Sequence, residues 1–432
     1  MAPQDVPGNA GSSPQDENRR LKRAVEELSI LNDLSRAIGG SVSLQDIMRT
    51  IIHRSLRAIH AEQGVITLVD RRARDSMKTF VRTAVSSSEI PQFHFNQSLL
   101  GWMHLNKKPL ALVDPRTDPR FKGVAWDESI SSLLCVPMMV KSELIGVLTV
   151  YNKREVPSFT EEDQRLLAII AGQSAQVVEN ARLYEEEQAL QRMKEEVRLA
   201  ATIQLDLLPK RAPEIPGYDI AGRSIPAQMV GGDYFDFIPM DGDRLALCLA
   251  DVSGKGLPAS LLMANVQATL RGQTLASPTA KICVARSNRL LHQSTSPEKF
   301  VTVFYGHLNY RTHTLTYCNA GQDNPLLFSA GKEPKRLGTG GIVLSIMEDY
   351  PFEEETVALA PGDCLVMFSD GITEAVNAAQ EQFGDSRVVS VVAAHRLEPA
   401  EAVIDAIVGS VIAHAGGAPQ ADDMTIVVLR RL

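Results

Sequence analysis

Four segments of the sequence place aspartates beside apolar, strand-like runs, and these are the residues best suited to chemistry. Asp251 ends "LALCLAD", Asp370 follows "CLVMFS", and Asp233 precedes "YFDF". The fourth segment, "DDMTIVVL", begins with Asp422 and Asp423. A carboxylate at the end of a buried strand is costly unless hydrogen bonds, a cation or water meet its charge. The four segments therefore need a common explanation.

Each segment alone suits an Asx-turn or a helix N-cap, the commoner use of a single aspartate. Four together, with Lys255 as the one basic residue inside the motifs, weaken that interpretation. Clustered like charges repel, and a divalent cation relieves the repulsion. Ligands that are all oxygen favour Mg²⁺ or Mn²⁺ over zinc. Glycines beside the aspartates allow backbone and ion to approach closely: Gly231, Gly232, Gly254, Gly256 and Gly371.

Two such ions about 3.5–4 Å apart lower the pKa of a bridging water and neutralise phosphoryl oxygens. That is the chemistry of phosphate-ester hydrolysis, and it needs no serine or cysteine nucleophile. The sequence shows no credible catalytic triad or CxxxxxR-type phosphatase loop. A metal-dependent nuclease also uses several carboxylates but favours a basic surface for its polyanion. The net charge of −8 gives little support to nucleic-acid or anionic-membrane partners, so a nuclease ranks last.

The rest of the composition indicates the compartment. The five cysteines are scattered without a CxxC pair, so neither a zinc knuckle nor a disulfide framework is predicted. The polar segment over residues 1–20 lacks the apolar core of a signal peptide and is predicted to be a disordered tail. No apolar stretch reaches membrane-spanning length. These features favour a soluble protein of the reducing cytoplasm.

The first part of the chain reads as one compact α/β domain over residues 22–184. An amphipathic helix is predicted over 21–38, and a second begins after Ser43, a suitable N-cap with Asp46 three residues later. A closing helix is predicted to begin near Ser158, again as its cap. Between these helices, β-branched runs predict strands over 64–70, 77–85, 133–140 and 144–153.

The closing helix has no evident stop before Leu208, which predicts a helical linker over 185–208. Leu183, Leu190 and Val197 repeat every seven residues, and a dimeric coiled coil and a solvated helix explain this pattern equally well. Three prolines in "LPKRAPEIPG" then mark a boundary, and a second domain follows over 209–432. It is predicted to alternate strands (244–251, 300–308, 314–321, 363–370, 424–431) with helices (258–276, 278–294, 397–414).

The second domain resembles the metal-dependent PPM-type serine/threonine phosphatases. "GGDYFDF", "ADVSGKG", "SDGITEA" and the terminal "DDMTIVVL" occur in the family's order, and "AATIQLDLLP" before them is similar to the bacterial branch of sporulation and sigma-factor regulators. The resemblance implies two sheets packed as an antiparallel sandwich with helices on both sides, an α-β-β-α arrangement. It places the metals at one edge of the sheets.

The resemblance also implies roles for single residues. Asp251 would bridge two Mn²⁺ or Mg²⁺ ions, with Asp370 and Asp422 completing one site. Asp233 and the backbone carbonyl of Val252 would serve the other. Asp423 stands where many relatives have asparagine, so either member of the pair 422–423 is a candidate ligand. Arg223 is the nearest match to the phosphate-gripping arginine of eukaryotic relatives, but it lies ten residues before Asp233 and is not assigned that role.

The first domain resembles a GAF domain through "LLGWMHLNKKPLALVDPRTDPRF", "SLLCVPMMVKSELIGVLTVYNK" and the helix that follows. This implies a pocket for a small ligand, whose identity the sequence does not give, and a tendency to dimerise. Asn152, Lys153, Phe159 and Asp163 match the NKFDE signature of cyclic-nucleotide-binding relatives, with Gln164 in place of the last residue; a structural role is favoured. Trp102 and Trp126 are predicted to be packing or pocket-wall residues, and Cys135 to fill the core.

Together these features predict a mixed α/β (α+β) enzyme, a phosphoprotein phosphatase regulated by its GAF-like domain. The resemblance implies a STAS-type anti-anti-sigma factor as the phosphorylated partner. The helix over 160–208 would transmit the signal, and a homodimer is expected. A non-catalytic phosphatase-fold scaffold is the alternative, against which the presence of Asp233, Asp251, Asp370 and Asp422 argues.

Overall fold

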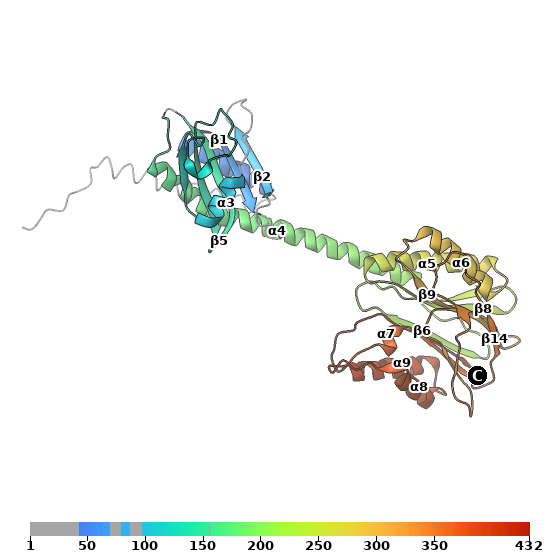
Figure 1. Ribbon diagram of the computed structural model, residues 1–432. Helices are drawn as coiled ribbons and strands as arrows, with labels where there is room; N and C mark the ends of the chain where they lie inside the picture. Colours follow the sequence, from blue (N-terminus) through green and yellow to red (C-terminus); the bar gives the residue numbers. More distant parts are fainter. Residues whose placement is uncertain (1–42, 70–78, 87–96, 155) are drawn as a thin grey trace, which may run out of the picture. The chain divides into compact units, whose positions relative to one another are not determined.

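The structure, a computed structural model, describes residues 43–69, 79–86, 97–154 and 156–432 (Figure 1). The chain divides into two compact units, Met1–Gln191 and Arg192–Leu432. The tail predicted over 1–20 and the helix predicted over 21–38 lie outside the described residues, and both stay predictions.

The first unit is built on one antiparallel sheet with the strand order β2-β1-β5-β4-β3. A core on one face of the sheet includes residues of helix α2 (Leu44–Ile59) and of the first part of helix α4 (Glu161–Leu207). A second core includes α3 (Gln97–Asn106) and the short 3₁₀ turn η1 (Pro119–Phe121). The strands are β1 (Ala61–Val69), β2 (Thr79–Ser86), β3 (Leu110–Val113), β4 (Ser132–Val140) and β5 (Glu143–Lys153).

The starts of α2 and α4 test the predicted caps. Ser43 caps α2, because its Oγ accepts a hydrogen bond from the backbone N–H of Asp46 at 3.2 Å, as predicted. The predicted cap Ser158 is wrong by two residues. Thr160 and Asp163 instead form the reciprocal box, in which each side chain accepts from the other's backbone N–H, at 3.2 and 2.8 Å. Ser158 and Thr160 both have an acidic residue three positions later, Glu161 and Asp163, so spacing alone did not separate the two caps; α4 begins at Glu161, which makes Thr160 the cap.

The NKFDE-like residues bind other parts of their own domain. Lys153 Nζ lies 2.8 Å from Asp163 Oδ1 and 2.8 Å from the carbonyl of Ile59, so it joins β5 to both helices on that face. Asn152 accepts from the N–H of Ser131 at 2.9 Å, and its amide donates to Ser129. These contacts support the structural interpretation of the signature.

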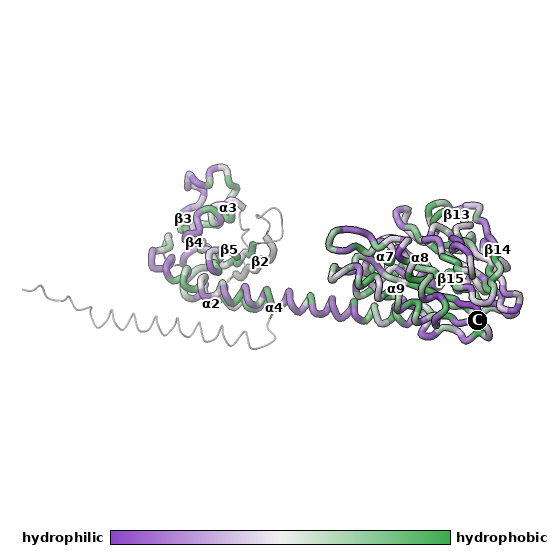
Figure 2. The backbone as a smooth tube through the Cα atoms, turned by 90° about the horizontal axis from the view of Figure 1, so that it is seen from below, coloured by the Kyte–Doolittle hydropathy of each residue, from purple (hydrophilic) through white to green (hydrophobic). Residues whose placement is uncertain are grey.

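Helix α4 is long and mostly hydrophilic (Figure 2). Its heptad leucines Leu183 and Leu190 are 50% and 53% exposed, and Met193 is 63% exposed. An apolar stripe of this kind is what a coiled-coil partner would cover. The coiled coil therefore stays a prediction.

The second unit contains two sheets, whose strand orders are β13-β10-β9-β8-β7, with β14 beside β10, and β12-β11-β15-β16-β6. All pairs are antiparallel except β10 with β13. The first sheet consists of β7 (Tyr234–Met240), β8 (Arg244–Val252), β9 (Val301–Asn309), β10 (Thr314–Ala320), β13 (Gly340–Gly341) and β14 (Glu355–Ala358). The second consists of β6 (Tyr218–Ile225), β11 (Leu326–Phe328), β12 (Lys335–Arg336), β15 (Cys364–Phe368) and β16 (Met424–Arg431).

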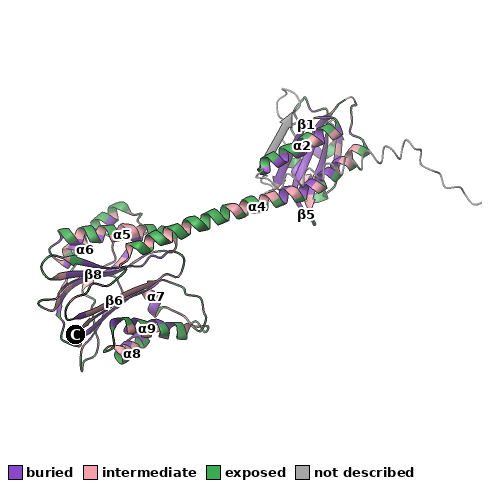
Figure 3. Cartoon of the chain, turned by 180° about the vertical axis from the view of Figure 1, so that it is seen from behind, coloured by how far each residue is buried: buried purple, intermediate pink, exposed green. Residues whose placement is uncertain are grey.

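These sheets pack face to face between two layers of helices, as Figures 1 and 3 show. A core of alternating strand residues, such as Leu247 and Val427, fills the space between the sheets. Separate cores lie under α5 and α6 on the first sheet and under α8 and α9 on the second. The helices are α5 (Leu257–Ala276), α6 (Ala280–Ser294), α7 (Asp370–Thr373), α8 (Gly384–His395) and α9 (Ala400–Ala415). The predicted α-β-β-α sandwich is confirmed.

Two further observations concern the whole described chain. Across residues 43–432, apart from the undescribed gaps, no helix combines the length and apolar character needed to span a bilayer. All five cysteines are free and buried, as predicted for core residues. Burial raises the pKa of Cys135, Cys318 and Cys364 to about 12, which keeps these thiols protonated and unreactive.

Candidate active site

The predicted aspartates lie at the ends of neighbouring strands in both sheets. Asp233 immediately precedes β7 and Asp251 lies at the end of β8, and these strands pair Tyr234 with Ala250. Asp370 opens α7 two residues after β15, while Asp422 and Asp423 immediately precede β16, the neighbour of β15. Each sheet therefore contributes one pair of acidic segments.

Hydrogen bonds join these segments across the sandwich. Ser369 Oγ donates to Asp233 Oδ2 at 2.8 Å and accepts from the N–H of Thr425 at 2.9 Å. Asp423 accepts from the N–H of Gly232 at 2.6 Å and from that of Ala227 at 2.7 Å. The four segments thus form one acidic edge, defined here by Asp233, Asp251, Asp370, Asp422 and Asp423. Sequence reasoning missed Ser369, whose one signal was its position next to Asp370.

The glycines of the acidic edge serve the packing of its own segments. A Cβ on Gly231 would lie 2.4 Å from Asp423 Oδ2, and one on Gly371 would lie 2.0 Å from the carbonyl oxygen of Asp423. Gly232 approaches the carbonyl of Val252, 2.9 Å from where its Cβ would be. At Gly371 the predicted close approach of backbone is present and is made by Asp423, while the approach of an ion stays a prediction.

Burial and mutual repulsion dominate the electrostatics of the acidic edge. Burial, followed by the charge of Asp251, raises the pKa of Asp233 well above its usual range. Burial and the charges of Asp370, Asp422 and Asp423 raise the pKa of Asp251 to about 7. Burial and the charge of Asp422 raise the pKa of Asp370 to about 6. Carboxylates held together at such cost form a strongly negative site that favours a bound cation.

The two adjacent aspartates have different surroundings. Both carboxylate oxygens of Asp423 accept backbone N–H groups, so this side chain positions the segments around Gly232. Asp422 Oδ2 instead faces the ammonium of Lys255, with Nζ 2.9 Å away. The charges of both reach the acidic edge: Asp422 raises the pKa of Asp251 and Asp370, and Asp423 raises that of Asp251 and Asp233.

The donor chemistry fits a hard divalent cation, since every candidate ligand is an oxygen. The described side chains are not, however, gathered closely enough to form a metal site as they stand. Among the residues that the structure describes, no three acidic, histidine or cysteine side chains are grouped so that they could hold a metal ion. The ion pair with Lys255 occupies Oδ2 of Asp422 in the present arrangement.

The contacts of Arg223 and Gln204 bear on the roles of these two residues. Arg223, on β6, forms ion pairs with Glu401 and Asp405 of α9, which supports leaving it without a substrate role. Gln204, near the end of α4, donates to the carbonyl of Gly231 at 2.6 Å and accepts from its N–H at 3.0 Å. This two-way contact ties α4 to the segment that carries Asp233, and sequence reasoning missed it.

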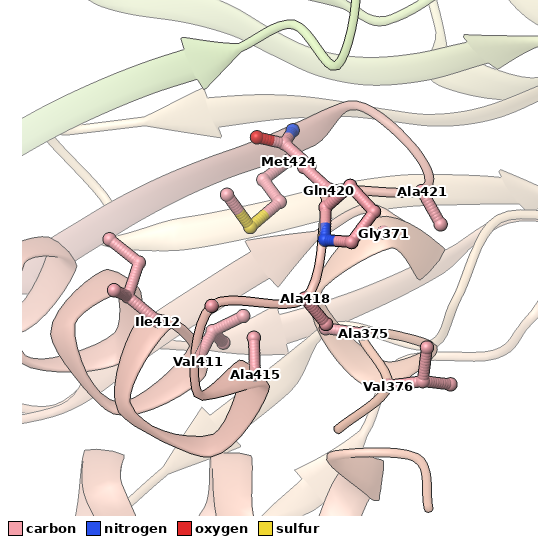
Figure 4. A pocket seen from close by; sticks show the side chains of 12 residues that line it. Gly371, Ala375, Val376, Val411, Ile412, Ala415, Ala418, Gln420, Ala421 and Met424 are labelled. Carbon is pink, nitrogen blue, oxygen red and sulfur yellow. The ribbon is translucent and has the colours of Figure 1, made fainter. Parts of the chain in front are cut away.

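An apolar cavity of about 140 Å³ borders the acidic edge (Figure 4). Gly371 and Ala421, neighbours of Asp370 and Asp422, line one side, and Val411 and Ile412 of α9 line another. No residue in its lining is ionisable. The cavity therefore lies beside the acidic edge and contributes no ionisable group to it.

Comparisons with known proteins agree with this architecture. Residues 241–432 match the family model of stage II sporulation protein E (SpoIIE), and residues 41–179 match that of the GAF domain. Phosphoserine phosphatase RsbU of Bacillus subtilis (strain 168) is 33% identical over 196 residues, which cover 44% of this chain and 58% of RsbU. Protein IcfG of Synechocystis sp. is 27% identical over 263 residues, 55% of this chain and 41% of IcfG.

A solved structure gives the same result for the fold. The SiaA-PP2C domain of Pseudomonas aeruginosa superposes with a TM-score of 0.50 and 20% identity, covering 56% of this chain and 98% of that domain. The chain spans about half the length of the curated relatives RsbU and IcfG. It carries a GAF domain followed by a SpoIIE-type (PPM) phosphatase domain, and it is homologous to the RsbU and SpoIIE phosphatases.

Proposed function

We propose that this protein is a metal-dependent serine/threonine phosphatase that hydrolyses phosphoserine or phosphothreonine on a protein partner. The observation that carries the proposal is the acidic edge itself, where buried carboxylates repel one another at one end of a SpoIIE-type sandwich. A charge cluster with raised pKa values in a folded core is costly, and such clusters are characteristic of functional sites. The similarity to a phosphoserine phosphatase supports the reaction class.

In this proposal Asp251, Asp370 and Asp422 would hold one Mn²⁺ or Mg²⁺ ion. Asp251, Asp233 and the carbonyl of Val252 would hold a second. When bound, such ions supply a water of lowered pKa and neutralise phosphoryl oxygens. The chain's own contribution is positional: Ser369 holds the Asp233 carboxylate by a hydrogen bond, and Asp423 fixes the backbone beside it.

We further propose that the GAF domain binds a small ligand and regulates hydrolysis through α4. The contact of Gln204 with Gly231 supports this, because Gly231 is two residues from Asp233. The exposed Leu183 and Leu190 support a homodimer formed along α4. The resemblance to sigma-factor regulators suggests a phosphorylated STAS-type anti-anti-sigma factor as substrate, in the cytoplasm.

A phosphatase-fold scaffold without catalysis is the alternative function. Hydrolysis of p-nitrophenyl phosphate and of a phosphoserine peptide, with Mn²⁺, with Mg²⁺ and with EDTA, separates the two. We expect metal-dependent turnover that Asp251→Ala abolishes and that Asp241→Ala, at an exposed aspartate of the same domain, preserves. Absence of turnover from folded wild-type protein under every metal condition would favour the scaffold.

A further inference from the structure

We propose that Lys255 binds the phosphate group of the substrate, a phosphate monoester on a serine or threonine side chain. This inference rests on the proposed phosphatase function and gives the site a residue for substrate recognition. Lys255 lies in the loop between β8 and α5, three residues after Val252.

The fold directs Lys255 to the acidic edge. Its Nζ lies 2.9 Å from Asp422 Oδ2 and 2.6 Å from the carbonyl of Ala421. An ammonium has three N–H donors, of which these contacts use two. The side chain is 49% exposed, so an incoming ligand can reach it from solvent.

Hydrogen bonds hold the loop that carries Lys255 at Ser253, and the chain turns at Gly254 and Gly256. The N–H of Ser253 donates to the carbonyl of Phe300 at 3.0 Å, and the N–H of Phe300 donates to Ser253 Oγ at 3.0 Å. Lys299 Nζ donates to the carbonyl of Ser253 at 3.1 Å. Gly254 and Gly256 have φ values of 101° and 71°, which other residues rarely adopt. The backbone on both sides of Lys255 is therefore set, while its long side chain remains able to move.

Charge explains why this lysine suits a phosphate. A dianionic monoester approaching several carboxylates needs positive charge beyond that of the ions bound by those carboxylates. Arg223 is occupied by Glu401 and Asp405 of α9. A divalent ion held by Asp422 would weaken the attraction that holds Lys255 there, and would leave its ammonium able to bind a phosphate group. Lys255 thus neutralises Asp422 before binding and the substrate phosphate afterwards.

The test compares the full-length variants Lys255→Met, Lys255→Arg and Lys335→Met. Lys335 is a matched control, since it is 50% exposed and pairs with Glu355, which is outside the acidic edge. The readouts are KM for a phosphoserine peptide, Ki for inorganic phosphate, and Mn²⁺ affinity by calorimetry. In Lys255→Met we expect KM and Ki to rise about tenfold, as for loss of one charge-assisted hydrogen bond. Mn²⁺ should bind more tightly, because Asp422 has lost its competing cation.

The outcomes separate recognition from a purely structural role. In Lys255→Arg, KM should return to within about threefold of wild type, since the guanidinium keeps the charge. If Lys255→Met matches Lys335→Met in KM and Ki, the inference is overturned. Weaker Mn²⁺ binding with unchanged Ki would likewise overturn it, showing that Lys255 only positions Asp422. Wild-type protein without any turnover would refute the proposed function itself and this inference with it.

Discussion

Replacing Asp423 by alanine tests whether the two adjacent aspartates divide structure and chemistry between them. Asp423 is 8% exposed, and its carboxylate accepts the N–H groups of Gly232 and Ala227 at 2.6 and 2.7 Å. Alanine leaves both donors without their acceptor. An unsatisfied buried donor costs about 1–3 kcal/mol. With about 2 for the buried Gly232 and about 1 for the half-buried Ala227, we expect the unfolding free energy of residues 192–432 to fall by about 3 kcal/mol.

The assay must observe the correct unit. Both tryptophans, Trp102 and Trp126, lie in the first unit, so their fluorescence does not report unfolding of the second. Urea unfolding followed by far-ultraviolet circular dichroism gives the stability. Amide hydrogen exchange in a peptide covering 227–232 gives the local effect, which we expect to be faster by about two orders of magnitude if exchange follows the same free energy.

Asp422→Ala is the matched comparison, because Asp422 is 35% exposed and faces Lys255. Here we expect little change in stability, with weaker Mn²⁺ binding and loss of hydrolysis. The reasoning is refuted if Asp423→Ala leaves unfolding and exchange unchanged. It is also refuted if the two variants lose Mn²⁺ affinity equally.

Four other perturbations test separate parts of the molecule. The pKa values of Asp251 and Asp370 are raised to about 7 and about 6. Between about pH 4 and 7 the folded protein therefore binds more protons than the unfolded chain. As a result, the metal-free protein should lose stability as the pH rises through that range. Thermal melting in EDTA at pH 5 and pH 8 checks this, and a higher melting temperature at pH 8 would contradict it. Gln204→Ala should lower phosphatase activity severalfold while leaving α4 helical by circular dichroism; full activity would argue against coupling through α4. Leu190→Lys should shift the protein from dimer to monomer in sedimentation experiments, and an unchanged mass would exclude a dimer along α4. Lys153→Met breaks an ion pair whose side chains are 11% and 13% exposed, so we expect a loss of about 3 kcal/mol in the first unit, visible by tryptophan fluorescence. A smaller loss than that of Arg165→Met, which breaks an exposed pair in the same unit, would contradict it.

The sequence predicted the long elements well because their signals are local. The apolar run from Met424 to Arg431 is β16, and the alternation around Cys248 is β8. Helix α8 was missed although Val388 and Val392, four residues apart and both buried, carry a helical signal. The short strands β12 and β13 have two residues each, too few for any periodicity. They form because the longer strands beside them offer unpaired backbone groups.

The acidic residues were also predictable, since each is marked by the strand it adjoins. Their partners were not, because the contacts join distant parts of the chain. Ser369 reaches Asp233 across 136 residues, and Asp423 reaches Gly232 across 191. A serine between an apolar run and an aspartate has many possible uses in a sequence, and the sandwich selects one. For the same reason the glycines were assigned to an ion, although the nearest atoms to Gly231 and Gly371 belong to Asp423.

Asp423 connects the proposed regulation through α4 with the repulsion among the carboxylates of the acidic edge. Its carboxylate holds the N–H of Gly232, and Gln204 holds both backbone groups of Gly231. A shift of α4 that breaks the Gln204 contacts would therefore act on a segment whose other anchors are Asp423 and the bond from Ser369 to Asp233. Asp233 is buried among like charges, so moving it away from them lowers the repulsion. Without metal, the acidic edge therefore favours a displaced Asp233. Ion binding reverses that balance, so metal occupancy and the position of α4 should be coupled, each stabilising the other.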